Sequence, residues 1–157
     1  MKLVADTSAL IALSTCEALD LLDKMFDEVF VTKEIYDECI ITGKPYSKKL
    51  SLFLKDKIKS TETDTILNLP SNLGKGEISA MLLSKMLNAD YLLIDDSRAR
   101  KIAKYNQIKV IGSVGVLLQA KKQNLIKSVS SYMNKLENSG LFMSQELINE
   151  VKRLAKE

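Results

Sequence analysis

The sequence has no histidine and no tryptophan, and only two cysteines and two prolines among its 157 residues. Without histidine there are no Ser-His-Asp or Cys-His catalytic triads and no histidine-containing zinc sites. Cys16 and Cys39 lie far apart in the sequence and form no CxxC pair, so we interpret them as buried structural thiols. Any enzymatic chemistry must therefore use carboxylates, hydroxyls, lysines or arginines.

Long apolar runs are also missing. No stretch approaches the roughly 18 residues that a membrane span needs, and the N-terminus lacks the apolar core and cleavage site of a signal peptide. We therefore expect a cytoplasmic protein with no membrane partner. Hydrophobic residues make up 46% of the chain and charged residues 27%. This balance and the length predict one globular domain over residues 1–157.

The formal net charge of +3 is only mildly basic, but the basic residues are clustered. The first cluster consists of Lys48, Lys49, Lys55, Lys57 and Lys59, with only Asp56 opposing it. The second consists of Arg98, Arg100, Lys101 and Lys104, directly after Asp95 and Asp96. Basic side chains around an acidic centre suit a phosphate backbone that is brought to a metal. For the first cluster, a solvated lysine-rich surface is an equally good interpretation.

Apolar runs alternate with segments of helical periodicity along most of the chain. Strands are predicted at 2–5, 28–31, 57–62, 91–94 and 109–111. Helices are predicted at 8–14, 16–25, 33–41, 47–54 and 77–87, after Asp96, and at 113–123. This alternation predicts an α/β fold with a central parallel five-stranded sheet and helices on both faces. The stretch 61–72 is the least regular and is predicted to be a loop.

The last segment, residues 128–157, has a different pattern. It predicts two helices with a break at 138–140 and a cap at Ser144. Apolar residues at helical spacing in the second helix are Leu147, Ile148, Val151, Leu154 and Ala155. We expect a C-terminal helical hairpin that buries this stripe on the main domain or on another chain.

Acidic residues occur where strands are predicted to end and helices to begin. Asp6 follows the first strand, and Asp95 and Asp96 follow the fourth, while Glu77 opens a helix. Glu38 lies in the helix after the second strand. Because strand ends and the following helix starts share one edge of a doubly wound sheet, these carboxylates are expected to lie close together.

A purely structural interpretation exists for each of these acids. Asp6, Glu77 and Asp96 are all well placed to cap helix N-termini. Periodicity does not distinguish Glu38 from its neighbours on a solvated helix face. Gathered carboxylates, however, repel one another and need a counter-charge. With no histidine or cysteine ligand set, Mg²⁺ or Mn²⁺ in an all-oxygen site fits this pattern best.

Four motifs resemble, in order and spacing, those of the PIN domain family. They are Val4–Leu10, Val31–Glu38, Gly76–Ala80 and Leu92–Arg100. The segment Val110–Leu118 and the final hairpin are similar to a PIN subgroup of predicted nucleic-acid-binding proteins. The resemblance therefore covers nearly the whole chain. It implies a three-layer α/β/α PIN-like fold.

The resemblance also implies a function. It is that of a Mg²⁺- or Mn²⁺-dependent endoribonuclease, often the toxin of a VapC-like toxin–antitoxin pair. RNA, an antitoxin protein and a second copy of the chain in a homodimer are the partners it implies. The alternative is a non-catalytic PIN-fold module that binds RNA or protein. A purely structural subunit is the third possibility.

Site residues follow from the same resemblance. Asp6, Glu38, Glu77 and Asp96 are implied as catalytic, metal-binding acids, and Asp95 stays beside Asp96 as a candidate metal ligand. Ser8 would support Asp6 through a hydroxyl hydrogen bond. Arg100 lies four residues after Asp96 on one helix face, where it would form a structural ion pair with that carboxylate or meet phosphate.

Overall fold

A sheet of four parallel strands forms the centre of the protein, in the order β2-β1-β3-β4. The computed structural model describes residues 1–61, 67–141 and 143–157. The strands are β1 (Lys2–Ala5), β2 (Glu28–Phe30), β3 (Tyr91–Leu93) and β4 (Val110–Ile111). Leu3, Val4, Leu92 and Leu93 are fully buried, as expected for parallel strands covered by helices. Val4 is in register with Phe30 on one side and Leu92 on the other.

The fifth strand, predicted at 57–62, is wrong. The described part of this stretch contributes one isolated parallel bridge, between Val31 and Ile58. The amide of Val31 donates to the carbonyl of Lys57, and the amide of Lys59 donates to the carbonyl of Val31. Ile58 is the only apolar residue between 57 and 61, so no apolar face drives longer pairing. Residues 62–66, which include the last residue of the predicted strand and part of the predicted loop, lie outside the described residues.

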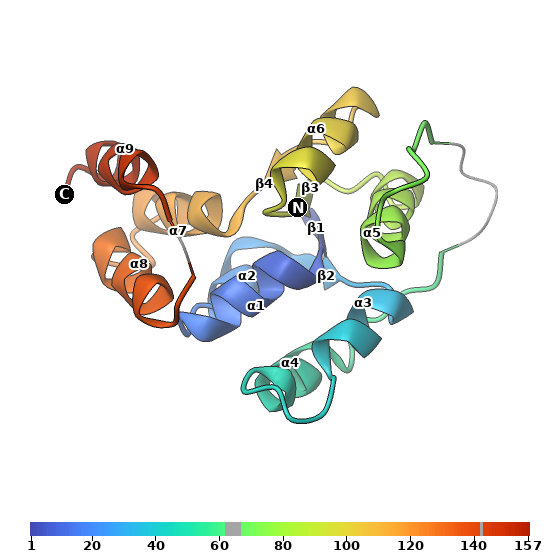
Figure 1. The fold of residues 1–157 in the computed structure, drawn as a ribbon, viewed down its shortest axis with the longest axis horizontal. Coiled ribbons are helices and arrows are strands. Elements are labelled where there is room, and N and C mark those ends of the chain that lie inside the picture. Colours follow the sequence, from blue (N-terminus) through green and yellow to red (C-terminus); the bar gives the residue numbers. More distant parts are fainter. Residues whose placement is uncertain (62–66, 142) are drawn as a thin grey trace.

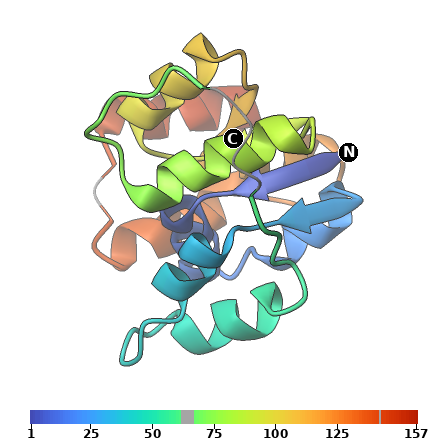
Figure 2. The same ribbon diagram turned by 90° about the vertical axis from the view of Figure 1, so that its right-hand side faces the viewer.

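Helices connect the strands and flank the sheet (Figure 1). They are α1 (Thr7–Thr15), α2 (Asp20–Met25), α3 (Lys33–Cys39), α4 (Ser47–Leu54), α5 (Lys75–Met86), α6 (Ser97–Tyr105), α7 (Ser113–Lys122), α8 (Val129–Asn138) and α9 (Gln145–Ala155). Figure 2 shows α5 lying along β1, with α3 and α4 on the far side of β1 from α6. The predicted α/β fold with a parallel sheet flanked by helices is confirmed. None of the described helices has the length and apolarity needed to cross a membrane.

The predicted helix at 16–25 begins only at Asp20. Glu17 adopts the left-handed conformation, with φ of 60°, which a continuous right-handed helix does not accommodate. Its side chain forms ion pairs with Lys49 of α4 and Lys135 of α8. Two helices form here, as the sequence predicts, but the turn between them is longer than predicted and takes up the first residues of the second helix.

The C-terminal hairpin consists of α8 and α9, which pack on each other and on α7. Gly140, with φ of 86°, provides the left-handed residue after α8. Glu157 fixes the other end of the hairpin. Its carboxylate accepts hydrogen bonds from the amides of Val129 and Ser130, from the Ser128 hydroxyl, and from the ammonium of Lys121. The start of α8 is thereby joined to the end of α9.

All four strands end at the same edge of the sheet, because they are parallel. Asp6 continues β1, and its amide donates to the carbonyl of Leu93 at 2.8 Å. The amide of Ile94 donates to the carbonyl of Ile111 at 2.9 Å. The segments that leave β1, β3 and β4 are thus held side by side. Three of the candidate acids, Asp6, Asp95 and Asp96, lie on these segments.

Candidate acidic site at the sheet edge

Asp6 is the most deeply placed of the candidate acids. Its residue is only 4% exposed, and the Ser8 hydroxyl donates to its Oδ2 at 3.0 Å, the contact implied by the resemblance. Burial, together with a smaller contribution from the nearby charge of Glu77, raises the pKa of Asp6 to about 6, against the hydrogen bonds from Ser8 and Thr7. A carboxylate at this position is therefore ionised at neutral pH only against the desolvation that burial imposes.

Glu38 is joined to this edge by Thr7 and Gly76. The Thr7 hydroxyl donates to Oε2 of Glu38 at 2.5 Å. A Cβ atom on Gly76 would lie 2.8 Å and 3.1 Å from the two carboxylate oxygens of Glu38. Only glycine at position 76 therefore leaves room for this carboxylate. Because Thr7 follows Asp6 and Gly76 precedes Glu77, Glu38 is placed beside the residues that flank both other acids.

Glu77 lies in the first turn of α5, where its Oε2 accepts from the Gly74 amide at 3.0 Å. This is half of a capping box, and it confirms that Glu77 has a structural role at the helix start. The carboxylate is half-buried. Its charge reaches Asp6 strongly enough to raise the pKa of that group. The capping and the functional interpretations of Glu77 are therefore compatible.

A buried hydroxyl pair holds α3 and α5 together beneath Glu38 and Glu77. The Oγ1 of Thr32 and the Oγ of Ser79 are 2.7 Å apart, and Ser79 also donates to the carbonyl of Gly76 at 2.8 Å. Thr32 in turn caps α3 by accepting from the Ile35 amide. Sequence reasoning assigned no role to Ser79. The signal that would have found it is a polar residue in the buried stripe of α5.

Asp95 and Asp96 separate clearly in the structure. Both oxygens of Asp95 accept from Ser113, one from the amide and one from the hydroxyl, each at 2.7 Å. Gly112, the N-cap residue of α7, has no side chain to do this, so Asp95 caps α7 from the segment that follows β3. Asp96 caps its own helix, accepting from the Ala99 amide at 2.8 Å through Oδ1. Its Oδ2 accepts no hydrogen bond from any residue that the structure describes.

The structural ion pair predicted between Arg100 and Asp96 does not form within the described ranges. Arg100 instead donates through Nη1 to the carbonyl of Ile94 at 3.2 Å. Its guanidinium lies against Gly112, where a Cβ atom would be 2.5 Å from Nη1. The i, i+4 spacing permits an ion pair between Arg100 and Asp96 but does not fix the rotamer of Arg100. Because Gly112 has no side chain, the guanidinium can lie against its backbone instead.

The site acids are Asp6, Glu38, Glu77, Asp95 and Asp96. None of them forms an ion pair with a lysine or arginine in the part of the chain that the structure describes. The donor set, carboxylate oxygens with a supporting serine, has the chemistry that Mg²⁺ and Mn²⁺ prefer. Among the described residues, however, no three acidic or thiol side chains are arranged to hold a metal ion. Glu38 and Glu77 are bound to protein donors and would have to turn toward an ion.

Cys39 adjoins the same acids but remains a neutral thiol. It is fully buried, and burial raises its pKa to about 12, with Glu38 and Asp6 adding to the effect against a hydrogen bond from Thr7. Burial likewise raises the pKa of Cys16 to about 11. Both cysteines are unbridged and buried, as predicted. Neither supplies the thiolate that a soft-metal site needs.

Comparison with protein families matches residues 2–157 to the family described as PIN domain. No curated protein matches the chain. The match spans all four motifs and the C-terminal hairpin. PIN domains are nuclease-type domains that typically use divalent metals, while the VapC-like subgroup remains a prediction. On this match the chain belongs to the PIN domain family.

Proposed function

We propose that this protein is a divalent-metal-dependent ribonuclease that hydrolyses phosphodiester bonds in RNA with Mg²⁺ or Mn²⁺. The observation that carries the proposal is the meeting of Asp6, Glu38 and Glu77 at one edge of the sheet without a basic partner. Like charges gathered in this way are unfavourable unless a cation joins them. Membership of a nuclease-type family agrees with this interpretation.

In this proposal each acid has its own part. Asp6, held by Ser8, is the fixed oxygen donor at the bottom of the site. Glu38 and Glu77 bind protein donors from exposed and half-buried positions, so their carboxylates are able to rotate toward an ion. Asp96 contributes the oxygen that does not cap α6. A bound divalent ion would polarise the scissile phosphate and lower the pKa of a water molecule.

The pKa of Asp6 should make metal binding depend on pH. A carboxyl group binds a hard cation only when it is deprotonated. Because burial raises the pKa of Asp6 to about 6, metal binding should weaken below that pH. Binding should also release a fraction of a proton at neutral pH, since the ion stabilises the charged form.

The first test measures thermal unfolding with EDTA and with Mn²⁺. We expect Mn²⁺ to raise the Tm of the wild type and to have no effect on the Tm of Asp6→Asn. Asp95→Asn is the matched control, because Asp95 already binds Ser113 through both oxygens. It should keep the Mn²⁺ response, whereas Asp96→Asn should lose most of it. An equal and flat response in all four proteins would contradict the metal site.

The second test is cleavage of a mixed RNA pool with Mg²⁺ or Mn²⁺, comparing the wild type with Asp96→Asn. Cleavage by the wild type alone supports the ribonuclease. If neither protein cleaves, the non-catalytic module that binds RNA or protein is favoured, and the lack of a preformed three-ligand cluster among the described residues already points that way. A toxin role would add an antitoxin partner, which co-expression with the neighbouring gene product would reveal.

A further inference from the structure

A cleft of about 450 Å³ lies between α6, the start of α7 and the C-terminal hairpin. Its lining comes from Asp95 and Ser97 on either side of Asp96, from Arg100, from the start of α7, and from the hairpin. In Figure 1, α6 and the α8–α9 hairpin stand on opposite sides of the start of α7. The volume is within the range of small-molecule sites, about 300–1,000 Å³.

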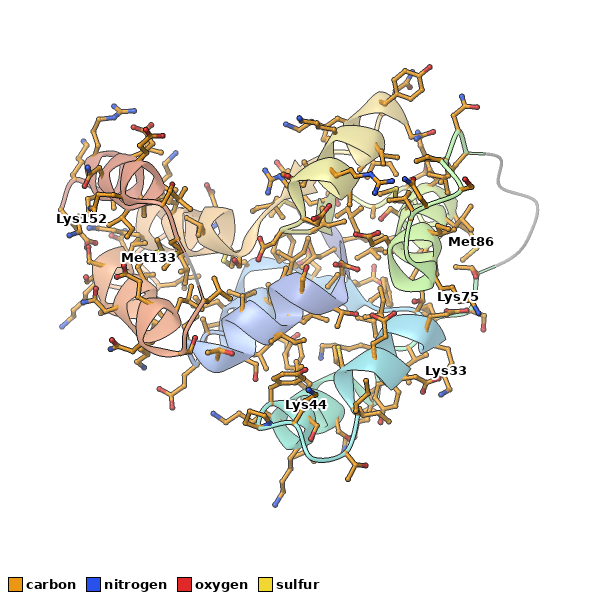
Figure 3. All side chains as sticks on the ribbon, viewed as in Figure 1. Lys33, Lys44, Lys75, Met86, Met133 and Lys152 are labelled. Atoms are coloured by element: carbon orange, nitrogen blue, oxygen red, sulfur yellow. The ribbon has the colours of Figure 1, made fainter. Side chains whose placement is uncertain are left out.

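The two walls of this cleft differ in chemistry. One wall carries Arg100 and Ser97 from α6. The other is apolar and comes from the hairpin, with Leu136, Leu141, Met143 and Leu147. Leu147 and Leu141 are each 41% exposed, so this wall presents apolar surface to whatever enters the cleft. Figure 3 shows the hairpin side chains around Met133 of α8 and Lys152 of α9, apart from those of α6.

Arg100 is the charged feature of the cleft. It is half-buried, and its one hydrogen bond with a described residue goes to the carbonyl of Ile94. No carboxylate of the described residues lies within ion-pair distance of its guanidinium. Asp95 is close by, but Ser113 satisfies both of its oxygens. The guanidinium therefore keeps hydrogen-bond donors for an anion that enters the cleft.

The charge of α6 indicates what kind of anion this is. The helix carries Arg98, Arg100, Lys101 and Lys104 and no acidic residue. None of these four forms an ion pair with the residues described. Arg98 and Arg100 also lie near the helix N-terminus, where the helix dipole disfavours positive charge. Helix stability thus does not explain this arrangement, and a repeating polyanion does.

We infer that this cleft binds one nucleotide of single-stranded RNA next to the scissile bond, with its phosphate on Arg100 and its base against the apolar wall of the hairpin. The inference rests on the proposed ribonuclease function. A peptide is disfavoured, because the charge on this wall comes from a helix with four basic residues and no acidic one, which suits a repeating polyanion. The hairpin would thereby hold the face of a base without selecting its identity, while α6 holds the phosphate.

The test measures RNA binding in EDTA by fluorescence anisotropy, so that cleavage is not required. The probes are a fluorescent single-stranded RNA and a series of otherwise identical RNAs, each with one abasic position at a different place. Leu147→Asn removes the apolar wall, and Leu154→Asn is its matched control on the same helix, 49% exposed and outside the cleft. Arg100→Gln removes the cation, and Lys104→Gln is its control for general charge. Thermal unfolding verifies that each variant is folded.

We expect Leu147→Asn to weaken binding of the intact RNA about fivefold or more and to leave binding of the best-placed abasic RNA unchanged. Arg100→Gln should weaken both probes about tenfold, more than Lys104→Gln does. Equal effects of Leu147→Asn and Leu154→Asn, or equal effects of the two charge variants, would overturn the inference. So would binding of a peptide library with no RNA binding. If RNA binds as expected but is never cleaved, the nuclease fails while the cleft stands.

Discussion

Gly76 offers the sharpest test of how the acidic edge is built. A Cβ atom there would be 2.8 Å from the nearer oxygen of Glu38, so Gly76→Ala must displace that carboxylate. The clash is with the end of a flexible, exposed side chain and not with backbone, which makes the displacement inexpensive. Gly76 also lies inside α5, where alanine is favoured over glycine by about 0.5–1 kcal/mol. Loss of the hydrogen bond between Thr7 and Glu38 opposes this by about 0.5–1.5 kcal/mol.

The two effects nearly cancel, so the metal-free free energy of unfolding should change by less than about 1 kcal/mol. The metal response should not be spared. At a Mn²⁺ concentration of about 100 times the wild-type Kd, binding stabilises the protein by about 2.7 kcal/mol. A tenfold weaker Kd, at the low end of about 10–100-fold for a misplaced ligand environment, reduces this to about 1.4 kcal/mol. Urea unfolding with EDTA and with Mn²⁺ measures both quantities.

Gly74→Ala is the matched control, because a Cβ atom at that position would be 3.5 Å from its nearest neighbour, Oε2 of Glu77. This is an ordinary van der Waals distance, and the Gly74 amide that binds this oxygen is kept. It should keep the full Mn²⁺ stabilisation. Glu38→Gln should reproduce the reduced response, and adding Gly76→Ala to it should reduce the response no further, since both changes act through one carboxylate. Full Mn²⁺ stabilisation of Gly76→Ala would refute the reasoning. So would a metal-free destabilisation of several kcal/mol, which would mean that the backbone, and not Glu38, gives way.

Three further predictions concern stability. Hydrogen bonds from Lys121, Ser130 and Val129 outweigh the effect of burial and lower the pKa of Glu157. The contribution of this carboxylate to the free energy of unfolding is therefore present above its unfolded-state pKa and lost as the pH falls. In urea unfolding, Glu157→Gln should cost about 1–2 kcal/mol at neutral pH and progressively less in acid. The raised pKa of Asp6 gives the opposite pH dependence. The contribution of Asp6 to the free energy of unfolding is present below its unfolded-state pKa and lost as the pH rises to about 6. In EDTA, Asp6→Asn should therefore be more stable than the wild type by about 1–3 kcal/mol at neutral pH and no more stable at about pH 4. Ser79→Ala should lower the free energy of unfolding by about 1–2 kcal/mol in a denaturant titration, because it removes the 2.7 Å contact with Thr32.

Much of the fold followed from local patterns. The runs at 2–5 and 91–94 are apolar at every position that the sheet buries, so their strands were predictable from sequence. The stretch at 57–61 has a single isoleucine between two lysines, and these described residues form only one bridge. Strand formation depends on what a neighbouring surface covers, and that surface is absent from the local pattern.

The candidate site divides in the same way. The positions of Asp6, Glu77 and Asp96 at helix starts were predictable because helix-start patterns are local. The predicted cap forms at Asp96, whereas the Asp6 side chain makes no cap hydrogen bond with a described residue. The contact of Glu38 with Gly76 was not, since it depends on how α3 packs against α5. Asp95 and Asp96 are adjacent and chemically identical, so only the position of Ser113, 18 residues beyond Asp95, distinguishes them.

The cap that Asp95 lends to α7 links positions that are distant in the sequence. Gly112 has no room for a side chain, since a Cβ atom would meet both Arg100 and Asp95. Serine or aspartate at position 112 would cap α7 with its own side chain. It would, however, displace the guanidinium of Arg100, and the cap from Asp95 would no longer be needed. We therefore expect the three positions to change together among relatives, with glycine retained wherever the acid and the arginine are.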